Sequence, residues 1–212
     1  MTNSSETGVQ HLGILWMLKL DRPLPDSPQA RIPMTYSRAD REEAEELAVA
    51  MGLDDSGPVL QRFERGSRCY IARADARIVA YGWISFDEEE IGELGLRMRL
   101  NQGEAYIWDC GTLPAYRGKR LYPALLGYML SEMQKAGVQR VWIGTDADNL
   151  PSQVGVALAG CQPVVDVVRD SATNRLVSRG RAGVSIEDVV DAHYAMFGNR
   201  DVTQIILAEM SE

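Results

Sequence analysis

The feature that most constrains the fold of this chain is a strand that runs through a short loop directly into a long amphipathic helix. Residues 105–112 are rich in strand-forming residues, and Pro114 stops the run. Residues 121–136 then show helical periodicity and are followed by Gly137. Their apolar face consists of Leu121, Leu125, Met129, Met133 and Ala136. A strand and a helix joined in this way predict a sheet that is covered by helices.

The other segments extend this pattern. Ser37 and Asp40 resemble a capping box, which predicts a helix that starts at Ser37 and ends before Gly52. The acidic run from Asp87 to Glu90 is interpreted as a solvated loop rather than a substrate-steering patch. The remaining predicted elements are strands at 12–19, 69–74, 77–86, 138–145, 162–168 and 175–179, and helices at 57–65, 150–159 and 186–196. This order predicts the α/β (α+β) class, with helices on the faces of a mixed sheet.

Composition excludes several classes of function. The formal net charge of −8 argues against a nucleic-acid binder, which needs a basic face. The longest apolar run, residues 12–18, is too short to cross a membrane and lacks the basic start of a secretory signal. The three cysteines form no CxxC pair, and the chain has neither an HExxH nor a GxSxG motif. We therefore expect a cytoplasmic protein with no metal, no nucleic-acid partner and no membrane partner.

The loop between the strand and the helix, residues 112–122, is basic. It contains two arginines and a lysine, and no acidic residue occurs between Asp109 and Glu132. The helix N-terminus adds free N–H groups and about half a positive charge. Together these features predict a binding site for an anion such as a pyrophosphate. The alternative is a solvated basic turn that only starts the helix.

This loop resembles the central motif of the GNAT superfamily of N-acetyltransferases. The segment from Thr112 to Tyr122 is similar to the family pattern Gln/Arg-x-x-Gly-x-Gly/Ala. Arg117 matches the first position, whereas Arg120 and Tyr122 stand where small residues are usual. In that family the loop contacts the pyrophosphate of coenzyme A mainly through backbone N–H groups.

Two further segments resemble the same family. Asn149 and Ser152, followed by Gly160-Cys161, are similar to a helix that begins after an Asn and ends in Gly-Phe. The hairpin with Ala80-Tyr81-Gly82 resembles the family's second and third strands. The resemblance implies a GNAT acetyltransferase core at 33–168. An N-terminal extension at 1–32 could hold a strand, and a hairpin and helix at 169–212 would complete the same domain.

The resemblance implies a mostly antiparallel central sheet and acetyl-CoA as the co-substrate, with no metal. It also implies which residues bind the co-substrate. These are Thr112, Leu113, Arg117, Gly118, Lys119, Arg120, Leu121, Tyr122, Asn149 and Ser152.

The implied activity is acyl-CoA-dependent N-acyl transfer, most directly of an acetyl group to a primary amine of a small molecule or peptide. A homodimer is compatible with the sequence. Trp83 and Trp108 either line the acceptor pocket or pack in the core. One alternative is a GNAT-like module that binds acyl-CoA with little or no catalysis. It is favoured by Val156, which stands where many members place a tyrosine that protonates the departing thiolate, and by Arg120 and Tyr122, which stand where small residues are usual. Another is a structural protein whose loop recognises a different phosphate.

A general base is expected, because a protonated amine is not nucleophilic. Glu104 lies just before the strand at 105–112, and Asp109 lies on it. Strand alternation puts Glu104 on the face of Thr112 and Asp109 on the other face, unless a bulge intervenes. We rank Glu104 above Asp109, with Asp146 as a third candidate; a structural or surface role is the alternative for each.

Overall fold

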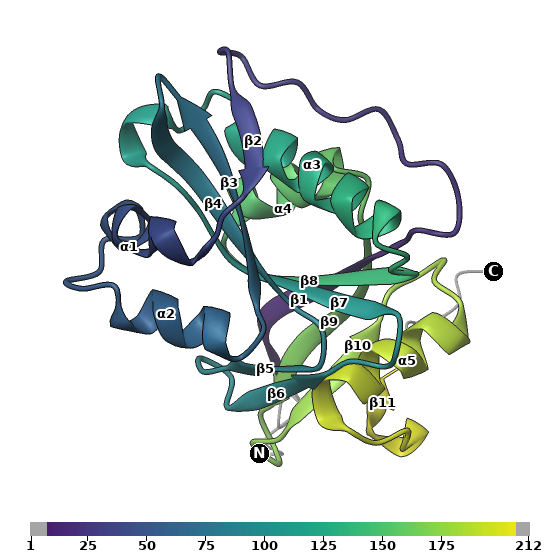
Figure 1. The fold of residues 1–212 in the computed structure, drawn as a ribbon. Coiled ribbons are helices and arrows are strands. Elements are labelled where there is room, and N and C mark those ends of the chain that lie inside the picture. Colours follow the sequence, from purple (N-terminus) through teal and green to yellow (C-terminus); the bar gives the residue numbers. More distant parts are fainter. Residues whose placement is uncertain (1–7, 207–212) are drawn as a thin grey trace.

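The structure, a computed structural model, describes residues 8–206 and is built around one large mixed sheet (Figure 1). In chain order, the strands of this sheet are β1 (Val9–Lys19), β2 (Thr35–Arg38), β3 (Arg68–Ala74), β4 (Arg77–Ser85), β7 (Glu104–Thr112), β8 (Arg140–Asp146), β9 (Gln162–Asp170), β10 (Leu176–Gly180) and β11 (Ile205–Ile206). They lie side by side in the order β11-β10-β9-β1-β8-β7-β4-β3-β2. The pairs β7–β8 and β10–β11 are parallel, and the other neighbouring pairs are antiparallel. The predicted mixed, mostly antiparallel α+β fold is therefore confirmed.

Helices cover both faces of this sheet, and a separate two-stranded hairpin packs against α5 (Ile186–Phe197). The hairpin pairs β5 (Glu88–Ile91) with β6 (Leu96–Arg99). The helices are α1 (Ala44–Met51), α2 (Gly57–Glu64), α3 (Leu121–Lys135), α4 (Leu150–Leu158) and α5 (Ile186–Phe197), and the short 3₁₀ turns are η1 (Arg41–Glu43), η2 (Pro114–Tyr116) and η3 (Val202–Gln204). None of the helices within residues 8–206 is long and apolar enough to cross a membrane.

The alternation of side chains along β3 assigns the helices to faces. Tyr70 packs in the core beneath α3, whereas its neighbour Ile71 packs beneath α1 and α2. On β7, Ile107 joins the α3 core and Tyr106 joins the core beneath α5. Thus α3 and α4 share one face, and α1, α2 and α5 lie on the opposite face (Figure 1).

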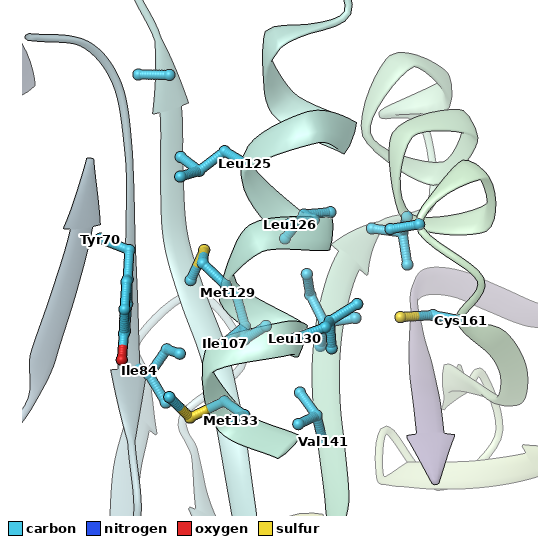
Figure 2. Packing of buried hydrophobic residues seen from close by; sticks show 14 of the residues in the cluster. Tyr70, Ile84, Ile107, Leu125, Leu126, Met129, Leu130, Met133, Val141 and Cys161 are labelled. Atoms are coloured by element: carbon cyan, nitrogen blue, oxygen red, sulfur yellow. The ribbon is translucent and has the colours of Figure 1, made fainter. Parts of the chain in front are cut away.

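The α3 core shows why residues 121–135 form a helix here. Figure 2 shows side chains of α3 directed at β7 and β8, with Cys161 on the side of α4. The buried residues of α3 that the figure labels are Leu125, Leu126, Met129, Leu130 and Met133. Burying each of these large side chains contributes about 1.5–3 kcal/mol.

The N-terminal strand β1 lies in the middle of the sheet, between β8 and β9 and antiparallel to both. Trp16 Nε1 donates a buried hydrogen bond of 2.9 Å to Thr145 Oγ1 on β8. Gly13 lies against the same strand, where a β-carbon would come within 2.8 Å of the Thr145 carbonyl oxygen. The strand predicted over 12–19 therefore forms, and it joins two segments that are far away in the sequence.

Two predicted details are wrong. Ser37 does not cap a helix, because it lies in β2, which pairs with β3. The capping box instead joins Asp40 to Glu43, and the chain then passes through η1 into α1. The acidic run is not a loop throughout, because Glu88–Ile91 pairs with β6 as β5. In both cases pairing with a neighbouring strand prevailed over the local signal.

Candidate functional site

A cavity of about 500 Å³ opens beside the point where β7 and β8 part. The two strands pair only from Glu104 opposite Arg140 to Ile107 opposite Ile143. The lining of the cavity comes from β1, from α3 and α4 on one face, and from α2, α5 and the β5–β6 turn on the other. Two molecules can therefore meet in this space from opposite faces of the sheet. We call it the central cavity.

The loop between β7 and α3 leaves backbone N–H groups without partners. Gly118 and Arg120 have φ values of 73° and 58°, in the left-handed region. For Arg120 this is a conformation that glycine usually supplies. No backbone hydrogen bond in the described part of the chain uses the N–H groups of residues 118–122, which lead into α3. Free N–H groups at the start of a helix can bind an anion.

Cationic side chains surround these N–H groups. Arg31, from the segment between β1 and β2, donates from its backbone N–H to the Lys119 carbonyl at 2.8 Å and from Nη1 to the Gly118 carbonyl at 3.4 Å. Arg117 Nε donates to the Thr112 carbonyl at 3.3 Å. Sequence reasoning did not identify Arg31, because nothing local to residue 31 indicates that it packs beside this loop.

The residues predicted to bind the co-substrate occupy two positions. Tyr122, Asn149 and Ser152 line the central cavity. Leu121 is 2% exposed, so its backbone N–H rather than its side chain is the group that a ligand could reach. The others lie along the strand end and the outer loop, namely Thr112, Leu113, Arg117, Gly118, Lys119 and Arg120. A binding role for these residues stays a prediction.

The start of α4 has the geometry that its sequence predicts. Asn149 Oδ1 accepts a hydrogen bond of 3.1 Å from the Ser152 backbone N–H, so the predicted cap is confirmed. Val156, one turn further along, is completely buried in the α3 core. Its side chain has no proton to donate.

Tyr122 reaches from α3 to α4 and fills the space beside Gly155. A β-carbon on Gly155 would come within 2.5 Å of Tyr122 Cδ1, so the ring requires the glycine. The phenol oxygen lies 3.4 Å from Ser152 Oγ. Burial raises the pKa of Tyr122, and the phenol is therefore protonated at neutral pH. A large residue at a position where the motif expects a small one thus carries a hydroxyl to the α4 side of the central cavity.

Asp109 lies at a bulge near the end of β7. Its φ is 41°, and the register with β4 shifts from Trp83 opposite Trp108 to Tyr81 opposite Gly111. The extra residue breaks the alternation of side chains. Asp109 therefore does not take the position that strict alternation assigns to it.

Arg62 of α2 holds Asp109 on the face of Trp108. Arg62 Nη1 donates to Asp109 Oδ2 at 2.5 Å, and its guanidinium carbon lies 4.6 Å from the Trp108 ring centroid and 5.1 Å from that of Trp83. The two tryptophans have different environments. Trp108 lines the central cavity, whereas Trp83 is completely buried and packs beneath α1 and α2.

Glu104 lies at the other end of β7, outside the lining of the central cavity. Its Oε1 accepts a hydrogen bond of 3.1 Å from Arg140, and its Oε2 accepts bonds from the backbone N–H and the side-chain amide of Asn101. Arg140 also donates to Asp191 at 2.7 Å. Both oxygens of Glu104 are thus occupied. The ranking of Glu104 above Asp109 rested on alternation, and the bulge removes that basis.

Further acidic groups reach the central cavity. Asp146, at the end of β8, is exposed and lines it. Glu93, in the turn between β5 and β6, also lines it, as does the ring of Tyr106. Sequence reasoning did not select Glu93 or Tyr106, because neither belongs to a motif. Across residues 8–206, no group of three or more His, Cys, Asp or Glu side chains is arranged to hold a metal ion.

Comparison with known families gives a match over the segment that builds this site. The model of the acetyltransferase (GNAT) family matches residues 32–154, which is more than half of the chain. This match includes the loop before α3, Asp109, Asp146 and the start of α4. A search of curated proteins found no match.

Several solved structures share the fold. An acetyltransferase of the GNAT family from Colwellia psychrerythraea aligns with a TM-score of 0.53 and 14% identity, over 76% of this chain and 56% of its own. A GCN5-related N-acetyltransferase from Sphaerobacter thermophilus aligns with a TM-score of 0.50 and 17% identity, over 74% of this chain and 50% of its own. This chain therefore spans about half the length of these two structures. At these identities the likeness is one of fold.

Proposed function

The chain belongs to the acetyltransferase (GNAT) family, and from that premise we propose that it transfers the acetyl group of acetyl-CoA to a primary amine of a small molecule or peptide. The observation that carries this proposal is the central cavity, which joins the α3–α4 face to the face that carries Asp109. The amine nitrogen attacks the thioester carbonyl carbon directly. A C–N bond forms, the C–S bond breaks, the nitrogen loses a proton and the sulfur leaves as CoA thiol.

Acetyl-CoA would bind on the α3–α4 face. The unpartnered N–H groups of residues 118–122, with Arg31 and Arg117 beside them, suit its pyrophosphate. The pantetheine arm would enter beside Asn149 and Ser152, where β7 no longer pairs with β8. Backbone N–H groups of this unpaired part of β7 would then polarise the thioester carbonyl.

We assign the general base to Asp109. It lines the central cavity, and one of its oxygens is held by Arg62. Its other oxygen has no hydrogen-bond partner within residues 8–206 and is available to the amine, directly or through a water molecule. Asp146 is the second candidate, because it lines the same cavity from β8.

The departing thiolate would receive a hydrogen bond from Tyr122. This phenol is protonated at neutral pH and lies beside Ser152 in the cavity lining, whereas Val156 has no donor. Donors aimed at developing charge stabilise the transition state. Tyr122→Phe should lower kcat by about fivefold to tenfold and leave acetyl-CoA binding unchanged. Ser152→Ala provides the comparison, and an unchanged kcat in Tyr122→Phe would remove Tyr122 from this role.

Turnover with a panel of amines tests the proposed function. Purified protein is incubated with acetyl-CoA and each amine, and release of free thiol and the mass of the N-acetylated product are measured. The alternative, an acyl-CoA-binding module with little catalysis, is favoured by Val156 and by Arg120 and Tyr122, which stand at positions where small residues are usual. Tight acetyl-CoA binding with no product from any amine would establish that alternative instead.

We also propose one domain with its core at 33–168, completed by segments 1–32 and 169–212. Support comes from β1, which lies between β8 and β9 in the sheet, and from α5, which packs against β9 and β10. Deletion of residues 1–20 should therefore unfold the domain, which circular dichroism would detect. Retained cooperative unfolding would contradict the proposal.

A further inference from the structure

The acceptor side of the central cavity carries more negative than positive charge. Its lining includes the carboxylates of Glu90, Glu93, Asp109 and Asp146, but only one guanidinium, that of Arg62. Two of these carboxylates have cationic partners, because Arg97 binds Glu90 and Arg62 binds Asp109. The other two, Glu93 and Asp146, have no ion-pair partner among the residues that the structure describes.

An independent observation comes from the hydroxyl of Tyr106. This residue is 6% exposed and lines the central cavity. Its oxygen lies beside Gly144, just beyond the last paired residues of β7 and β8. A β-carbon on Gly144 would stand only 3.0 Å from this oxygen. Within residues 8–206 no side chain or backbone group hydrogen-bonds this hydroxyl, and its oxygen is open to the cavity rather than sealed from it. A hydroxyl on an otherwise buried side chain that faces a cavity can hydrogen-bond a ligand bound there.

The charges around this hydroxyl agree with a cationic ligand. Burial raises the pKa of Tyr106 most, and Cys110, Glu89, Glu93 and Asp146 raise it further. The phenol is therefore neutral, and its oxygen can accept a hydrogen bond from a cation. An ammonium group has three donors, which a hydroxyl oxygen and two carboxylates would satisfy.

The reacting amine does not neutralise these carboxylates at the moment of attack. It must lose its proton before it attacks the thioester, so it is uncharged when it reacts. Two carboxylates beside the reacting nitrogen would stabilise its protonated form. A protonated nitrogen has no free lone pair and cannot attack the thioester. A positive charge that persists through the reaction would therefore belong to another part of the acceptor.

We propose that the acceptor is an amine with a second cationic group, and that this group binds between Glu93 and Asp146 beside the Tyr106 hydroxyl. This inference rests on the proposed amine acetylation and adds the class of substrate. The second cation remains charged throughout the reaction, while the first amine is deprotonated near Asp109. The preference for such a substrate is then electrostatic and weakens as salt is added.

Matched acceptors test the proposal. Steady-state kinetics compare 1,4-diaminobutane with 4-amino-1-butanol, which has the same chain length and only one amine. We expect kcat/KM for the diamine to be about tenfold higher or more, as is typical of a close charge pair. Glu93→Gln should remove most of this preference, and Tyr106→Phe should reduce it. Glu88→Gln is the matched control, because Glu88 lies on the same hairpin, is bound to Arg97 and does not line this cavity.

The outcomes separate the two proposals. Equal kcat/KM values for the diamine and the amino alcohol would overturn the second cationic site and leave amine acetylation standing. A preference that survives Glu93→Gln in the folded protein would also overturn it. If no amine is acetylated although acetyl-CoA binds, the proposed function fails and this inference fails with it. Thermal unfolding of each variant shows whether Tyr106→Phe has kept the fold.

Discussion

The two ends of β7 carry carboxylates in opposite circumstances. At Glu104, β7 is paired with β8. The side chain is 8% exposed, and its two oxygens accept hydrogen bonds from Arg140 and Asn101. At Asp109, the pairing with β8 has ended, the backbone bulges, and the 33% exposed side chain binds Arg62 through one oxygen. In β7 the strand stabilises the sheet where it is paired and leaves a side chain available for chemistry where it is not.

The largest expected effect is at the paired end. Glu104→Gln should lower the free energy of unfolding by about 3 kcal/mol, because it leaves Arg140 without one of its buried partners. Urea unfolding measures this change. Glu88→Gln, which breaks an exposed pair with Arg97, should cost less than about 1 kcal/mol. Below the unfolding transition, Glu104→Gln should retain kcat/KM within about twofold. A stable but inactive variant would show that Glu104 takes part in the reaction.

The next effect is at the bulge. Asp109→Asn should lower kcat/KM for the amine by about 100-fold, equal to roughly 2.7 kcal/mol of transition-state stabilisation, through loss of the base. Acetyl-CoA affinity measured by calorimetry should stay unchanged. Asp146→Asn separates the two candidates when the acceptor is 4-amino-1-butanol, which has no second cation for Asp146 to bind. If Asp146→Asn shows the larger loss while Asp109→Asn is active from about pH 6 to about pH 9, the base is Asp146.

A smaller effect is expected in the loop that follows β7. Gly118→Glu should raise the Kd for acetyl-CoA at least about tenfold above that of Gly118→Ala, because a carboxylate would face the pyrophosphate. The two variants share the strain of a left-handed backbone, and a β-carbon meets nothing within 4 Å. Calorimetry therefore isolates the charge. Equal Kd values for the two variants would place the pyrophosphate elsewhere.

The smallest effect concerns pH at the paired end. Burial alone would raise the pKa of Asp191, but hydrogen bonds from Arg140 and Arg200 outweigh it and lower the pKa. A lowered folded-state pKa contributes stability above the unfolded value of about 3.9, and that stability is lost as the pH falls below it. Between about pH 5 and about pH 3, the free energy of unfolding should fall by about 1 kcal/mol less in Asp191→Asn than in the unsubstituted protein. An identical fall in the two proteins would show that the lowered pKa of Asp191 does not contribute to the pH dependence of stability.

Local signals were sufficient for much of the fold and part of the site. The strand before Pro114, the helix at 121–135 and the Asn149 cap depend on residues within one or two turns. The loop before α3 was also visible as a basic segment without acids. These features could be predicted because their causes, hydrophobic period and capping, lie in the segment itself.

The rest depends on distant pairings. No local pattern places Arg31 beside the loop before α3, or Arg62 beside Asp109. The bulge at Asp109 arises in the register with β4, and it removes the alternation argument by which Glu104 was ranked above Asp109. Likewise, Tyr106 becomes a cavity residue only because Gly144 on the neighbouring strand leaves room for its hydroxyl.

The central place of β1 has a consequence for how the chain is made. Residues 9–19 leave the ribosome before their partners in β8 and β9, which end at residues 146 and 170. During synthesis at about 5–20 residues per second, this apolar strand waits for several seconds with unpaired edges. Contacts of such long sequence separation also slow folding. The nascent chain therefore has an aggregation-prone interval that ends only when β1 enters the sheet and closes the wall of the central cavity.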